Sequence, residues 1–150
     1  MKRTIAFAVS IFMAPVALLA DTVYLNCEVK KSSRGAMAES VESLLGDTSA
    51  FTVSLNEGTG SINHNYTSPS RIKDFRATGV FGLSSVEYSW SVPYHLGGSL
   101  RIRITKEISI DRSNLDAQVI TVVRESNRLL PAYTEQGKCT IVDVGRTRKF

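Results

Sequence analysis

The sequence predicts an all-β fold, an antiparallel meander of about eight strands that closes as a small barrel or forms a two-layer sandwich. Apolar and polar residues alternate along most of the chain, which is typical of strands with one buried face. Short runs rich in Gly, Asn, Asp and Ser separate these stretches, as turns do. The two cysteines, Cys27 and Cys139, stand in the first and the last stretch.

Each alternating stretch has one apolar parity, and each therefore predicts a half-buried strand. In the first stretch, every second residue from Val23 to Val29 is apolar or cysteine. The same pattern recurs in later stretches, at Phe51, Val53 and Leu55; Val86, Tyr88, Trp90 and Val92; Leu100, Ile102 and Ile104; and Cys139 with Ile141.

Three stretches have a less regular pattern. Residues 99–110 predict one long bent strand or two shorter ones, and Lys106 on the apolar parity predicts a β-bulge or break. The segment 117–123 is apolar on both faces, which predicts a central strand covered on both sides. The segment 67–85 is weakly patterned and has room for one short strand.

One segment follows helical rather than strand periodicity. Met37, Val41, Leu44 and Leu45 recur at helical spacing, and Gly46 follows as a typical C-terminal stop. The sequence therefore predicts a short helix at about 36–45, directly after the first strand.

The first 20 residues predict a secretory signal peptide. Lys2 and Arg3 precede an apolar run that is too short for a membrane-spanning helix. Cleavage after Ala20 would leave a single β-rich domain, residues 21–150, that is periplasmic or secreted. Without the leader, the chain has 16 basic and 14 acidic residues. Their scattered positions argue against a nucleic-acid partner.

The C-terminal residue, Phe150, calls for a comparison with outer-membrane barrels, whose last strand has alternate residues facing lipid. Counting back in twos from Phe150 would place Arg148 and Arg146 against lipid, where arginine is costly. The sequence therefore predicts no membrane insertion.

The cysteine pair predicts a disulfide. In an oxidising compartment two cysteines normally pair, and Cys27–Cys139 is the single connectivity available. Such a bridge requires Cα atoms within about 7 Å, so the first and last strands must lie side by side or face each other across a thin core. We expect the bridge to hold the closing strands of the sheet together.

Candidate catalytic groups are few. His64 shares the parity of Ile62 and Tyr66, which indicates a core histidine. The sequence contains no hydrolase, metalloprotease or phosphate-binding motif. With both cysteines oxidised, a zinc or copper site lacks ligands, and residues 111–116 lack the glycine of a calcium loop. The sequence therefore predicts no catalytic activity, no metal site and no cofactor.

The residues around the Gly-rich turn 95–98 are the candidate ligand-binding site, because aromatic residues and arginine are favoured in recognition surfaces. They are Tyr94, His95, Arg101 and Arg103. The first hypothesis is a protein-interaction module, either an inhibitor or a binding protein whose partner is another envelope or extracellular protein. The alternative is a carrier of a small apolar ligand with a cavity inside a barrel. Bulky inward residues favour the first hypothesis.

Four short motifs accompany the leader: YLNC (24–27), ISIDRSN (108–114), GKC (137–139) and the closing RKF (148–150). In these features the chain resembles small secreted or periplasmic β-rich proteins of Gram-negative bacteria. The resemblance implies an exported β-rich domain and assigns no functional residue.

Overall fold

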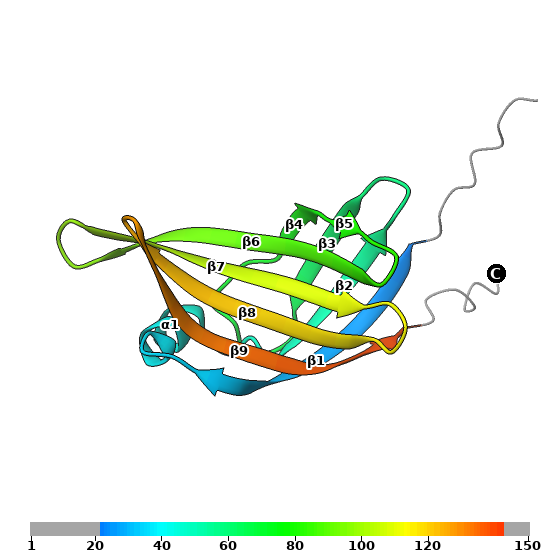
Figure 1. Cartoon of the computed structure of the whole chain (residues 1–150), viewed down its shortest axis with the longest axis horizontal. Helices are drawn as coiled ribbons and strands as arrows, with labels where there is room; N and C mark the ends of the chain where they lie inside the picture. The colour runs from blue at the N-terminus through cyan, green and yellow to red at the C-terminus, as the bar shows by residue number, and fades with distance from the viewer. Residues whose placement is uncertain (1–21, 143–150) are drawn as a thin grey trace, which may run out of the picture.

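A computed structural model describes residues 22–142, which form a nine-stranded sheet and one short helix (Figure 1). The elements in chain order are β1 (Val23–Arg34), α1 (Ala38–Leu45), β2 (Ala50–Asn56), β3 (Ser61–Tyr66), β4 (Phe75–Thr78), β5 (Val80–Phe81), β6 (Ser85–Leu96), β7 (Leu100–Asp111), β8 (Asp116–Glu125) and β9 (Arg128–Ile141). The all-β prediction is confirmed. The expected signal peptide and the C-terminal residues used in the membrane comparison lie outside the described residues.

The sheet is a nearly closed barrel. Most strands pair with the next strand in the chain, and the first strand, β1, pairs with the last, β9. The seam is bordered by the two edge strands of the sheet, β4 and β5. There β4 pairs with β3, whereas β5 pairs with β6 after the single intervening residue Gly79. The chain therefore crosses the seam at Gly79, whose N–H donates to the carbonyl of Gly60 at 2.9 Å.

The predicted disulfide is confirmed. Cys27 and Cys139 lie directly opposite each other in the register of β1 and β9, with Cα atoms 4.0 Å apart. Both side chains are buried. The first and last strands are therefore side by side, and a buried disulfide is compatible with an oxidising, exported compartment.

Two apolar clusters fill the barrel. One occupies the end where β1 begins and includes Leu25, Phe51 and Ile110. The other lies beside α1 at the end where the β6–β7 hairpin turns, and it includes Ile104 and Val123. Period-two alternation produces both clusters, because every second residue of each strand points inward.

The predicted helix is confirmed as α1, and it begins at Ala38, two residues after the expected start. Val41 and Leu45 are fully buried against the barrel. Gly46 ends the helix with a φ of 73°, and its N–H donates to the carbonyl of Glu42 at 2.9 Å. A positive φ favours glycine at this position.

The predicted bulge or break near Lys106 is wrong. Strand β7 is continuous from Leu100 to Asp111, and its pairings with β6 and β8 keep their register throughout. Lys106 points inward with 1% of its side chain exposed. The strand needs no bulge because Glu135 of β9 supplies a compensating carboxylate at 3.0 Å.

The prediction that 117–123 is covered on both faces is also wrong. In β8 the inward residues are buried, but Gln118 is exposed on the outer face, and Ile120 and Val122 are only half-buried there. Gln118 and Ile120 on this outer face line a surface pocket.

Candidate binding surface

The four residues predicted to bind a ligand lie in the β6–β7 hairpin, whose loop extends beyond the other strands (Figure 1). The register places His95 opposite Arg101 and Pro93 opposite Arg103. His95, Arg101 and Arg103 are exposed on the outer face. Tyr94 is half-buried and packs against the apolar cluster beside α1, and burial raises the pKa of its hydroxyl. The structure therefore brings three of the four residues together on one face and turns the fourth inward.

A fourth basic residue, Arg124 of β8, lies directly opposite Arg103. We call His95, Arg101, Arg103 and Arg124 the basic surface. A pocket of about 340 Å³ lies among these residues. Sequence reasoning missed Arg124, although the alternation of β8 places it on the exposed parity. Its position beside Arg103 depends on the β7–β8 register, which alternation alone does not give.

The positive charges of the basic surface lack compensating negative charges among residues 22–142. Like charges directly opposite each other in a sheet are destabilising, and Arg103 and Arg124 are such a pair. Within residues 22–142, no carboxylate forms a salt bridge with Arg101, Arg103 or Arg124. Arg103 donates one long hydrogen bond, 3.4 Å, to Ser91 Oγ. The guanidinium groups are therefore free to bind carboxylates, which match their planar fork.

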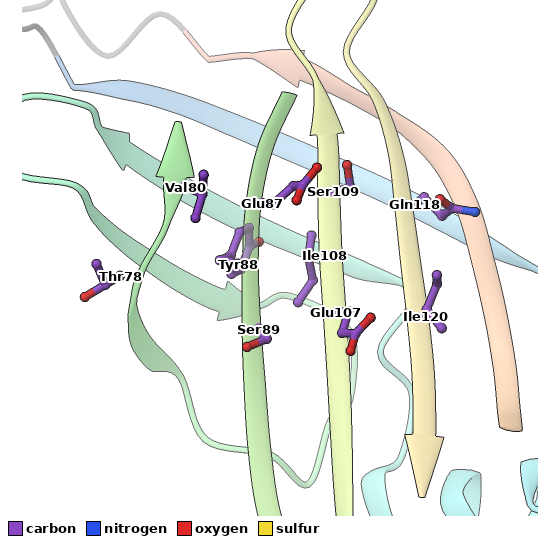
Figure 2. Close-up of a pocket in the computed structure, with 10 residues that line it drawn as sticks. All are labelled: Thr78, Val80, Glu87, Tyr88, Ser89, Glu107, Ile108, Ser109, Gln118 and Ile120. Carbon is purple, nitrogen blue, oxygen red and sulfur yellow. The ribbon is translucent and has the colours of Figure 1, made fainter. Parts of the chain in front are cut away.

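The same outer face carries acidic residues nearer the other end of the barrel. A pocket of about 520 Å³ lies over β6, β7 and β8, and Figure 2 shows Glu87, Glu107 and Gln118 among its lining side chains. In the register, Glu87 is opposite Ser109 and Glu107 is opposite Ser89. The two carboxylates are therefore diagonal neighbours on adjacent strands.

An apolar pocket of about 350 Å³ opens at the end of the barrel where β1 begins. Leu25 and Ile110, each 2% exposed, are among its innermost residues, and Ile141, 66% exposed, lies on its rim. Arg112 lies at its edge and donates to both carboxylate oxygens of Glu57, at 2.9 and 3.2 Å. Arg112 and Glu57 are therefore paired, and the carboxylate of Asp111, which also lines the pocket, accepts hydrogen bonds from Ser113 and Asn114. The remaining lining is mostly apolar and suits an uncharged apolar group.

Buried polar side chains also lie inside the barrel. The Lys106 ammonium donates to Glu135 and to the hydroxyl of Thr48, both at 3.0 Å. Burial lowers the pKa of Lys106, and the charge of Glu135 opposes that shift. The sequence pattern gave no indication of Glu135 as its partner. Because both side chains are 1% exposed, this pair cannot meet a substrate from solvent.

His64 is the second buried polar group. Its Nδ1 lies 2.8 Å from the hydroxyl oxygen of Tyr88, as expected for a core histidine. Burial lowers its pKa to about 3, with a smaller contribution from the charge of Lys106. The side chain is 1% exposed, so its role is in packing rather than in proton transfer to a ligand.

Across residues 22–142, no three side chains of His, Cys, Asp or Glu are grouped so that they could hold a metal ion. In the same part of the chain, no helix has both the length and the apolar character needed to cross a membrane. No protein-family model, curated protein or solved structure matches this chain.

Proposed function

We propose that the protein is an exported, non-catalytic interaction module that binds an acidic region of another envelope or extracellular protein. The contact is made by the basic surface. The observation that carries this proposal is the cross-strand pair Arg103 and Arg124, two exposed guanidinium groups with no carboxylate partner among residues 22–142.

The layout of the basic surface favours a protein partner over a single small anion. Its residues come from three adjacent strands, β6, β7 and β8, and therefore extend about 10 Å across the sheet. Such a spread matches several carboxylates held apart on a folded surface. Arginine at such positions contributes specificity and a fast, salt-dependent association.

Charge reversal tests the proposal. Wild-type protein, an Arg103→Glu/Arg124→Glu variant and a Lys30→Glu/Lys73→Glu control are immobilised and exposed to an extract of the producing cell's envelope and medium. Both control positions are exposed and lie outside the basic surface. We expect quantitative mass spectrometry to find an acidic protein retained by wild type and control, and lost from the arginine variant. Identical captured proteins for all three would refute the proposal.

A second candidate function, binding of a small apolar ligand, is supported by the pocket of about 350 Å³ at the end of the barrel. This pocket lies at the mouth of the barrel, whereas large side chains such as Phe51 and His64 occupy the interior. The test is a titration with the uncharged fluorophore N-phenyl-1-naphthylamine. We expect Ile141→Arg, on the rim, to abolish binding and Leu129→Arg, at an exposed site outside the pocket, to retain it. Absence of binding to wild type would eliminate this candidate.

A further inference from the structure

The outer face of β6, β7 and β8 separates its charges by sign. Along β7 the outward residues run from Arg101 and Arg103, through Thr105, to Glu107. On β6 the outward residues run in the matching direction, from His95 through Ser91 to Glu87. The half of the face near the hairpin is therefore basic, and the other half is acidic.

These charges are not neutralised within the part of the chain that the structure describes. Among residues 22–142, neither Glu87 nor Glu107 forms a salt bridge, and the arginines of the basic surface form none either. On β7, Arg103 and Glu107 are four positions apart, about 13 Å along a strand, too far to pair with each other.

We propose that this face is a self-association surface, on which a second copy of the chain docks in the opposite strand direction. The two-fold axis lies between the facing sheets, perpendicular to the strands and over Thr105. Because Arg103 and Glu107 are each two positions from Thr105, this axis brings Arg103 of one copy over Glu107 of the other. The operation repeats every contact, so two such pairs form.

Strand β6 fits the same axis. Ser91 pairs with Thr105, and His95 and Glu87 are each four positions from Ser91. The axis therefore places His95 of one copy over Glu87 of the other. The row that lies on the axis is small and uncharged, with a hydrogen bond of 3.1 Å between Ser91 and Thr105 and with Val122 beside them. Small central residues allow two sheets to approach to about 10 Å.

A second copy is the occupant that the charges favour. On β6 and β7, both signs lie in an order that is self-complementary when one copy is reversed, which is the requirement for a two-fold interface, whereas on β8 Arg124 falls over the uncharged Ile120. A purely acidic partner would satisfy the basic half and leave Glu87 and Glu107 facing like charge.

Self-association goes beyond the proposed function and limits partner binding to the form that is not self-associated. Because Arg103 belongs to both surfaces, the self-associated form and the partner complex exclude each other. Self-association is measured on the protein alone, so its failure would leave the proposed partner binding standing, and failure to capture a partner would leave self-association standing.

The test is a complementary charge swap, followed by sedimentation equilibrium of the full chain. We expect wild type to dimerise at about 0.01 M salt and to dissociate at about 1 M, where the Debye length falls to about 3 Å. Arg103→Glu and Glu107→Arg are each expected to raise the dimer Kd at least tenfold, because each change places like charges together at both sites. An equimolar mixture of the two variants is expected to form heterodimers, because every facing pair is then opposite in sign.

The control is Lys30→Glu, which reverses an exposed charge on β1 and is expected to dimerise as wild type does. Three results would overturn the inference: a wild type that stays monomeric at low salt, a dimer that Arg103→Glu leaves unchanged, or variants whose mixture fails to associate. Far-ultraviolet circular dichroism checks that both variants keep the β fold.

Discussion

His64 shows how one buried side chain couples the stability of this barrel to pH. Its ring stacks between Phe51 and Phe75, at centroid distances of 4.4 and 4.7 Å, and Tyr88 contacts Nδ1. Burial lowers the pKa of His64 from 6.5 to about 3. Below pH 6.5 the unfolded chain therefore binds a proton that the native state does not bind until about pH 3, so stability falls as pH falls through this window.

We predict a loss of about 2 kcal/mol in unfolding free energy between pH 7 and pH 5, from about 1.4 kcal/mol per unit below pH 6.5. Urea unfolding at the two pH values measures it. The control is His64→Phe/Tyr88→Phe, which removes both hydrogen-bonding groups together and is expected to lose this pH dependence. An equal loss in wild type and in the double variant would contradict the assignment to His64.

Lys106 and Glu135 show why a buried charge is tolerated in the middle of a strand. Each has 1% of its side chain exposed, and their charged atoms are 3.0 Å apart. We predict that Lys106→Met lowers stability by about 3–5 kcal/mol, because Glu135 is then a buried charge without a partner. Lys106→Met/Glu135→Met removes both charges and is expected to recover most of that loss. Urea unfolding of the three proteins decides this, and a double variant as unstable as the single would show that the pair itself is required.

At the scale of elements, the close pairing of β9 with β1 depends on a glycine. A Cβ on Gly137 would overlap the Glu28 carbonyl and lie 2.7 Å from Val29 Cα. These contacts are backbone atoms, which cannot rotate away. We predict that Gly137→Ala lowers stability by about 3 kcal/mol, the upper part of the range for overpacking. The control is the exposed neighbour Gln136→Ala, expected to change stability by under about 0.5 kcal/mol in thermal unfolding. Equal stability of the two variants would contradict the close approach.

The elements also show what the sequence could and could not predict. Alternation identified β1 and β7 because their inward residues, such as Leu25 and Ile104, recur every second position. In the segment 67–85 it left room for one short strand, whereas the structure has two, β4 and β5, whose four and two residues are too short for a pattern. It also read Lys106 as a break, because its partner Glu135 comes from another strand and depends on three-dimensional register. For the same reason, sequence patterns could predict only part of the basic surface. His95, Arg101 and Arg103 share one hairpin, whereas Arg124 lies beside them only because β7 pairs with β8.

At the scale of the whole molecule, the closure of the barrel, apart from its seam at β4 and β5, depends on pairing between the two ends of the described chain. The β1–β9 ladder runs from Leu25–Ile141 to Arg34–Tyr133, and the disulfide lies within it. The ladder's hydrogen bonds maintain this closure in the native state. The disulfide acts chiefly on the unfolded chain, where it restricts a loop of 112 residues.

Removing the disulfide separates these two contributions. We predict that Cys27→Ala/Cys139→Ala keeps the barrel, because the β1–β9 ladder does not need the sulfur atoms, and loses about 4–5 kcal/mol of stability through the freed loop. Circular dichroism reports the fold, and urea unfolding of the variant beside wild type reports the loss. Wild type treated with a thiol reductant is expected to unfold at the same urea concentration as the variant. A loss below about 1 kcal/mol would mean that the ladder alone determines closure. A variant without β structure would mean that the barrel cannot close unless its ends are covalently joined.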